Sequence, residues 1–191
     1  MALSTTAASF TFEDYVAYDD GSENRYELVD GELVAMTPPT FRHMLIAKFV
    51  EQRLDAEIAR LGLGWFCFRE AGVRTGVRKS RLTDVYVLTS EQVSSLVNRA
   101  AIAQAPPLLA VEVVSSDSVT RDYRYKRTEY AALEIPEYWI LDPLELKVTV
   151  LVFNEGLYDE AVFVGDQALV SPTFPELALT VDQILAAGEL P

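Results

Sequence analysis

The chain has 191 residues, half of them apolar, and a formal net charge of −13. This length and apolar content suffice for one substantial core, so we expect a single domain over residues 11–191 behind a loose N-terminal segment, residues 1–10. The strong negative charge excludes a general attraction for nucleic acid. Any phosphate-binding surface must therefore be local.

Cysteine content and hydropathy predict a cytoplasmic protein. The single cysteine, Cys67, excludes an intramolecular disulfide and fits a reducing compartment. Because it lies within WFCF, we expect a small buried hydrophobe rather than a nucleophile. The first ten residues lack the basic start and apolar stretch of a signal peptide, and no run of residues is long and apolar enough to span a membrane.

Sequence patterns in the first half of the chain predict helices, a hairpin and strands, with a basic stretch among them. Asp30-Gly31 is a strong two-residue hairpin signal, and apolar residues at spacings of three and four before Gly62 predict a long helix. The stretch 71–81 contains four basic residues and is expected to be the main positive patch. The predicted elements are a helix over 11–18, hairpin strands over 25–29 and 32–36, a helix over 42–61, and strands over 65–69 and 83–88.

The second half predicts further strands around one helix. The apolar run 108–114 is typical of a strand buried on both faces. The other predicted elements are a helix or loop over 90–105, a helix over 121–133, strands over 138–141, 147–153 and 157–164, and a last short strand and helix within 177–187. Together these elements predict an α/β (α+β) fold, with a mixed sheet and helices packed on it.

Two carboxylates stand in strands that are otherwise strongly apolar. Glu112 interrupts the run 108–114, and Asp84 lies near the start of the strand 83–88. A buried carboxylate is costly unless it is paired, protonated or bound to a metal. If the two strands are neighbours, both carboxylates can converge on one Mg²⁺ (or Mn²⁺), and Lys126 can supply a compact positive charge. Taken alone, this pattern favours a structural ion pair.

An ordered set of motifs adds to that pattern. The motifs are RYELVDGELVAM, Pro38-Pro39 with His43, the Asp84 strand, LLAVEVVS, RDYRYKRTEYAALEIPEYWILD and LTVDQIL. From about residue 12 to residue 187 the chain resembles the Uma-two family of proposed restriction endonucleases, which belongs to the PD-(D/E)XK nuclease superfamily. The resemblance implies a restriction-endonuclease-like core, a central mixed β-sheet flanked by helices. It also implies a Mg²⁺-dependent DNA endonuclease that hydrolyses phosphodiester bonds.

The resemblance assigns roles to the residues of the two strands. Asp84 would be the metal-binding aspartate, Glu112 the acid of the E-x-K element, and the main-chain carbonyl of Val113 a third metal ligand. Val114 stands where the superfamily usually has a lysine, and Lys126 on the following helix would replace that lysine. This departure from the superfamily pattern puts activity in question.

The family motifs also single out residues outside the two strands. Glu27 and Glu32 match the acids of the hairpin motif. We expect one of them to add a carboxylate to the site. The alternative for each is an acid exposed on the hairpin with no role in the site. His43, the only histidine, would approach the scissile phosphate or cap the long helix.

Binding to DNA requires positive charge that the chain as a whole lacks. We expect a local cleft lined by basic residues, and we expect a homodimer that presents two sites together. One alternative is a catalytically inactive nuclease-fold module that binds nucleic acid or protein, which the valine at position 114 motivates. Another is a structural protein in which an arginine bridges Asp84 and Glu112. The basic residues assigned to the cleft are Arg74, Arg78, Lys79, Arg121 and Lys126.

Overall fold

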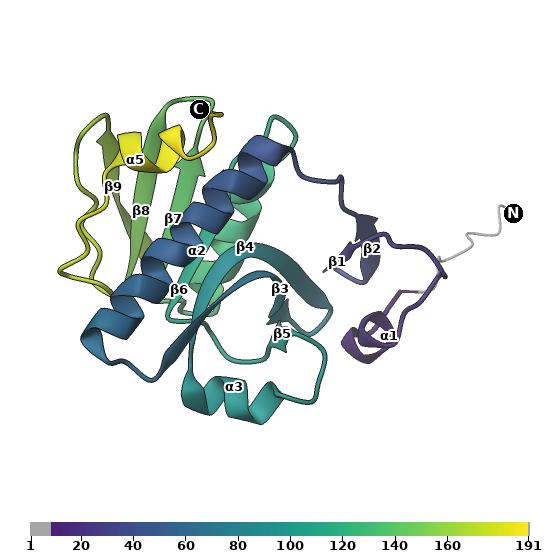
Figure 1. Cartoon of the computed structure of the whole chain (residues 1–191). Coiled ribbons are helices and arrows are strands. Elements are labelled where there is room, and N and C mark those ends of the chain that lie inside the picture. Colours follow the sequence, from purple (N-terminus) through teal and green to yellow (C-terminus); the bar gives the residue numbers. More distant parts are fainter. Residues whose placement is uncertain (1–8, 191) are drawn as a thin grey trace, which may run out of the picture.

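The computed structural model describes residues 9–190, in which nine strands form one mixed sheet with helices on both sides (Figure 1). The strands are β1 (Tyr26–Val29), β2 (Glu32–Ala35), β3 (Trp65–Gly76), β4 (Lys79–Thr89), β5 (Ile102–Ala103), β6 (Leu109–Val113), β7 (Glu137–Asp142), β8 (Lys147–Asn154) and β9 (Leu157–Val164). The helices are α1 (Phe12–Val16), α2 (Phe41–Leu61), α3 (Ser90–Leu96), the π-helical segment η1 (Arg121–Lys126), α4 (Arg127–Ala132) and α5 (Val181–Ala186).

The sheet follows the order β2-β1-β4-β6-β7-β8-β9, and β3 and β5 extend it beside β4. The β6–β7 and β3–β5 pairs are parallel, whereas the other pairs are antiparallel. The mixed sheet flanked by helices confirms the expected fold class.

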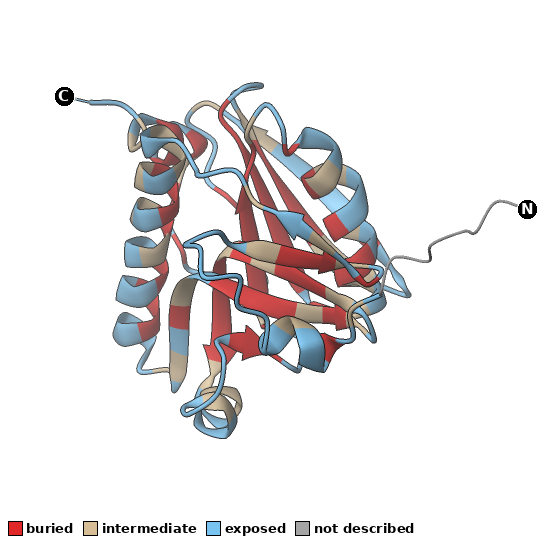
Figure 2. Ribbon diagram, turned by 90° about the vertical axis from the view of Figure 1, so that its right-hand side faces the viewer, coloured by how far each residue is buried: buried red, intermediate tan, exposed pale blue. Residues whose placement is uncertain are grey.

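The core lies between the sheet and α2. Along α2, apolar side chains that include Ile46, Val50 and Leu54 are fully buried and pack against strand residues such as Val111 and Trp139. The Thr40 side chain accepts a hydrogen bond from the His43 N–H at the start of the helix, and Gly62 ends it. A second cluster, around Tyr130 and Tyr138, fills the space against α4. Figure 2 shows buried residues concentrated in the sheet between the two sets of helices.

Most predicted elements are present, but the stretch 71–81 forms strands, and of its four basic residues only Arg78 is exposed. β3 continues to Gly76 and β4 begins at Lys79, and the two strands pair along this length. At Gly72, Ile102 of β5 packs directly on β3. Arg81 is buried with 4% of its surface exposed, so its charge is not available to a ligand on the surface.

The predictions for the two ends of the chain are only partly confirmed. The expected strand near residue 180 is wrong, since only an isolated bridge joins Ala168 and Thr180, although the helix capped by Thr180 is present. Residues 1–8 of the segment expected to be loose lie outside the described residues. The described Phe10 donates a backbone hydrogen bond to the Gly31 carbonyl.

Cys67 is buried as predicted, and burial raises the pKa of its thiol. None of the helices within residues 9–190 combines the length and hydropathy that a membrane crossing requires.

The contact at Gly72 gives a stability prediction. A Cβ at position 72 would lie 2.8 Å from Cγ1 of Ile102, whereas a Cβ at Gly76 would make only ordinary contacts, 3.5 Å and more, with Lys79. We expect Gly72→Ala to lower the free energy of unfolding by about 1–3 kcal/mol, because it overpacks the β3–β5 contact. Gly76→Ala should change it much less. Urea denaturation of both variants checks this, and equal effects would contradict the assigned packing.

Candidate active site

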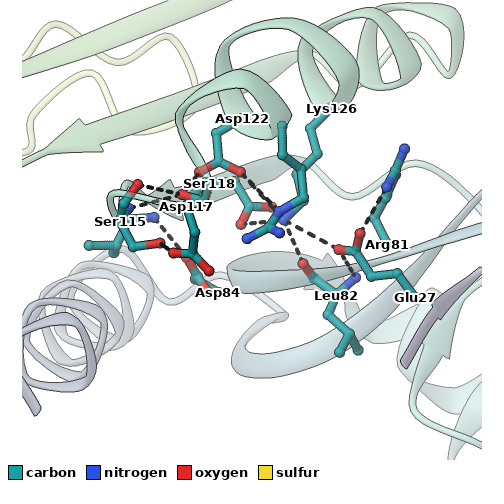
Figure 3. Close-up of polar contacts among 12 residues, drawn as sticks. Glu27, Arg81, Leu82, Asp84, Ser115, Asp117, Ser118, Asp122 and Lys126 are labelled. Carbon is teal, nitrogen blue, oxygen red and sulfur yellow. Dashed lines mark hydrogen bonds and ion pairs between the residues drawn. The ribbon is translucent and has the colours of Figure 1, made fainter. Parts of the chain in front are cut away.

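The candidate site lies along the edge of β4 that pairs with two different strands, β1 and β6. β3 pairs along the opposite edge of β4, while β1 meets β4 at Ser80 and β6 pairs with residues 85–87. The stretch 81–84 therefore runs between the ends of β1 and β6. Asp84 belongs to this interval, and Lys126 reaches it to contact Glu27 and the Leu82 carbonyl (Figure 3). The interval gives polar side chains a place in an otherwise apolar sheet.

Asp84 lies at the point where the β4–β6 ladder stops. The ladder ends with the pair Val85–Val111, and in place of a further rung the N–H of Val113 donates to Oδ2 of Asp84 at 2.7 Å. Nε2 of His43, from the first turn of α2, lies 3.0 Å from the same oxygen. Although burial opposes it, the hydrogen bond and charge of His43 lower the pKa of Asp84. Asp84 is thus held as a carboxylate.

Glu112 is the next residue in register on the neighbouring strand. Its Oε2 accepts a hydrogen bond from Nζ of Lys126 at 2.7 Å, and its Oε1 accepts one from the hydroxyl of Tyr130 at 2.7 Å. The side chain has 1% of its surface exposed. Burial raises the pKa of Glu112 well above its usual range, and the negative charge of Asp84 adds to the effect against the opposing charge of Lys126.

Lys126 is the cation at the centre of the site. Besides Glu112, its Nζ donates to the Leu82 carbonyl at 2.7 Å and lies 3.7 Å from Glu27 and 3.9 Å from Asp122 (Figure 3). Burial alone would lower the pKa of Lys126, but the surrounding carboxylates, Glu112 foremost, outweigh it and raise the pKa. Lys126 therefore carries its charge although its side chain is only 3% exposed.

A second buried network of ion pairs, around Arg81, adjoins Lys126 through Glu27. The guanidinium of Arg81 makes two hydrogen bonds to Glu129, at 2.6 and 2.8 Å, and one to Glu27 at 2.8 Å. Glu27 also accepts the backbone N–H of Leu82 at 3.1 Å. The network ties β1, β4 and α4 together around the base of the site.

The described residues of the site gather five carboxyl groups around a small number of cations. Arg81 and Lys126 lie among them, and Lys79 lies 3.6 Å from Glu129. Burial raises the pKa of Glu112 and of Asp122, so these two acids do not count as full negative charges. The five carboxyl groups are those of Glu27, Asp84, Glu112, Asp122 and Glu129.

The donor set fits Mg²⁺ better than a transition metal. Within residues 9–190 no group of three or more His, Cys, Asp or Glu side chains is arranged to hold a metal ion. A cation would therefore rely on Asp84, Glu112, main-chain oxygen and water, which is the usual environment of Mg²⁺. Because the N–H of Val113 faces Asp84, and the N–H and C=O of one strand residue face the same neighbour, the Val113 carbonyl is directed toward the same interval.

The structure brings together most of the residues selected from the sequence. Glu27, His43 and Lys126 approach the two strand acids directly or through each other. Glu32 does not, because it lies exposed on β2. No arginine bridges Asp84 and Glu112 within the described chain; Arg81 pairs instead with Glu27 and Glu129.

Sequence reasoning missed three members of the site. Asp122 is buried beside Lys126 and accepts a hydrogen bond from Ser118, while Arg81 and Glu129 form the supporting pair. Asp122 and Lys126 are four residues apart, a spacing that places two side chains on one side of a helix and that could have signalled the contact. Arg81 carried no comparable signal, because its partners lie 48 and 54 positions away.

A cleft of about 790 Å³ opens over the acids. The expected basic lining is only partly correct: Arg121 and Lys126 line the cleft, but the three basic residues expected from the stretch 74–79 do not. Arg25 and Arg42 line it in their place, because residues 23–25 before β1, residues 36–40 after β2 and the first turn of α2 belong to its walls.

The chain matches the model of one protein family, Uma2, described as "Putative restriction endonuclease", over residues 12–182. Its fold is similar to that of "a putative nuclease belonging to DUF820 from Anabaena variabilis ATCC 29413", with a TM-score of 0.79 and 18% sequence identity over 94% of this chain and 99% of that chain. The type IIG restriction endonuclease BpuSI aligns with a TM-score of 0.41 and 14% identity, over 82% of this chain but 17% of that chain. No curated protein matches the sequence. The family match confirms the resemblance seen in the motifs.

The buried network predicts a large effect of removing Arg81. Arg81→Met would leave Glu27 and Glu129 buried without their cation, and we expect a loss of about 3–5 kcal/mol in the free energy of unfolding. The matched control is Arg127→Met, which breaks the exposed pair with Glu160 and should cost at most about 1 kcal/mol. Denaturant melts measure both. Similar losses in the two variants would show that the Arg81 network does not hold the site together.

Proposed function

Since the chain belongs to the Uma2 family, we propose that it is a Mg²⁺- or Mn²⁺-dependent endonuclease that hydrolyses phosphodiester bonds in DNA. One observation carries the proposal. Two acids from adjacent strands, Asp84 and Glu112, line a cleft, and the charged Lys126 is paired with Glu112. Carboxylate oxygens are ligands that Mg²⁺ prefers in proteins.

Asp84 and Glu112, with the Val113 carbonyl, are the residues that would hold the ion. When bound, Mg²⁺ polarises a phosphoryl oxygen and lowers the pKa of water. Asp84 is oriented for this role by the hydrogen bonds from Val113 and His43, which fix the position of Oδ2.

Lys126 would stabilise the negative charge that develops on the phosphate. Its position is fixed by the Leu82 carbonyl and by Glu112, so no rearrangement of a flexible side chain is needed to place the charge at the floor of the cleft. Glu27 positions Lys126 from the side opposite Asp122. The lysine that the superfamily carries at the position of Val114 is replaced in this proposal by Lys126, since Val114 itself packs in the core with 2% exposure.

The net charge of −13 does not prevent local binding of a phosphodiester. Arg42 and Arg121 line the cleft and could contact phosphate oxygens, whereas Arg25, also in the lining, is paired with Glu70 at 2.8 Å.

A catalytically inactive binding module is the second candidate, and one observation favours it. Both carboxylate oxygens of Glu112 already accept hydrogen bonds, from Lys126 and Tyr130. In that case the ion pair would be structural, and no cation would displace it. A cytoplasmic location and a homodimer remain predictions of the sequence.

The proposal predicts metal-dependent nicking of supercoiled plasmid DNA. With Mg²⁺ or Mn²⁺, Asp84→Asn, Glu112→Gln and Lys126→Met should each lower the rate by about 100-fold or more, because each removes a group at the reacting centre. His43→Ala should cost about 10- to 100-fold through the orientation of Asp84. Agarose gel assays of initial rates measure these effects.

The matched control is Asp166→Asn, which removes an exposed carboxylate outside the cleft and should leave the rate unchanged. Circular dichroism and melting curves must first show that all variants fold. Nicking that survives the three main substitutions would overturn the assignment of the centre. Absence of nicking by the intact protein with either metal would favour the binding module.

A further inference from the structure

The walls of the cleft carry apolar side chains above the charged floor. Met36 and Pro38, which follow β2, and Met44 of α2 lie in the lining, and Leu144, in the turn after β7, also contributes. Met44 and Leu144 are exposed by 37% and 52%. The outer surface of a DNA duplex presents phosphate and sugar, whereas the faces of bases become available for apolar contacts only when a strand is unpaired or a base is flipped out.

The floor of the cleft is too deeply placed for contact with a flat surface. Lys126 and Glu112 have 3% and 1% of their side chains exposed, and Asp84 has 22%. The volume of about 790 Å³ is that of a site for a small molecule or a few nucleotides. A phosphodiester can reach the floor if its strand enters the cleft without a paired complement.

Two arginines of the lining are available for the backbone of such a strand. Arg42 lies 3.9 Å from the nearest carboxylate oxygen, which belongs to Glu189, and Arg121 lies 3.9 Å from Asp122. Their side chains are 42% and 25% exposed. By contrast, Arg69 and Arg127, outside the cleft, are paired with carboxylates at 2.6 and 2.7 Å. A guanidinium without a close carboxylate partner can donate to phosphate oxygens.

The net charge of the chain also favours a single strand over a duplex. A net charge of −13 repels a duplex more strongly than a single strand, because the duplex carries about twice the phosphate charge per unit length. With attraction confined to the cleft, few phosphates can be contacted at once.

We propose that the cleft takes one unpaired DNA strand, with its phosphates on Arg42 and Arg121 and its bases against Met36, Met44 and Leu144. The inference rests on the proposed function and narrows its substrate to single-stranded DNA, including unpaired regions within a duplex. Arg42 and Arg121 are then positioning residues for the strand.

Binding can be measured separately from cleavage. Fluorescence anisotropy with a labelled 12-nucleotide single strand and a hairpin duplex of the same composition would be recorded in Ca²⁺, which neutralises the carboxylates at the floor. The single strand should bind at least about tenfold more tightly than the duplex. Since two or three phosphates are contacted, log K should fall with log salt with a slope of about −1.4 to −2.1.

Variants locate the binding surface. Arg42→Gln and Arg121→Gln should each weaken single-strand binding about fivefold or more and lower the magnitude of the salt slope by about 0.7. Met44→Asp should weaken binding of the single strand and leave the anisotropy measured with the duplex unchanged. Arg124→Gln is the control, because Arg124 is exposed on the same segment as Arg121 but does not line the cleft.

Equal or tighter binding of the duplex, binding of neither form at micromolar protein, or an effect of Arg124→Gln as large as that of Arg121→Gln would overturn the inference. The proposed function is judged by plasmid nicking instead. Nicking together with a preference for duplex would therefore reject the single-strand inference alone. Single-strand binding without nicking would reject the nuclease alone.

Discussion

The ammonium group of Lys126 is the interaction on which the rest of the site depends. It is buried among Glu27, Glu112 and Asp122, and these carboxylates come from three separate parts of the chain. Without this cation, mutual repulsion and the cost of burial would force the acids to become protonated or to separate. Lys126 therefore permits these acids to lie together in the interior of the protein.

The sheet provides the space for this cluster by sharing one edge of β4 between β1 and β6. Residues 81–84 run between the two partners, so polar side chains can meet there without breaking a continuous ladder. Arg81 and Asp84 lie in this interval and project to different members of the site.

The sequence predicted the pieces that depend on local patterns. Hairpin chemistry at Asp30-Gly31 and the spacing of apolar residues in α2 are local signals, and both elements are present. The acid in β6 was visible because an apolar strand surrounds it. Arg81, however, reads as a surface cation, since its burial depends on Glu27 and Glu129, which only the tertiary fold brings near. The lining of the cleft depended in the same way on how the segments on either side of the β1–β2 hairpin lie against α2.

A crystal structure of the intact protein at saturating Mn²⁺ tests the central claim most directly, because the anomalous signal locates the ion independently of any activity. The account predicts a peak between Asp84 and Glu112, within bonding distance of both carboxylates, with Lys126 still directed into the cleft. Absence of a peak there, with Lys126 bound to Glu112 as in the metal-free protein, would show that the carboxylates form a structural ion pair rather than a metal site.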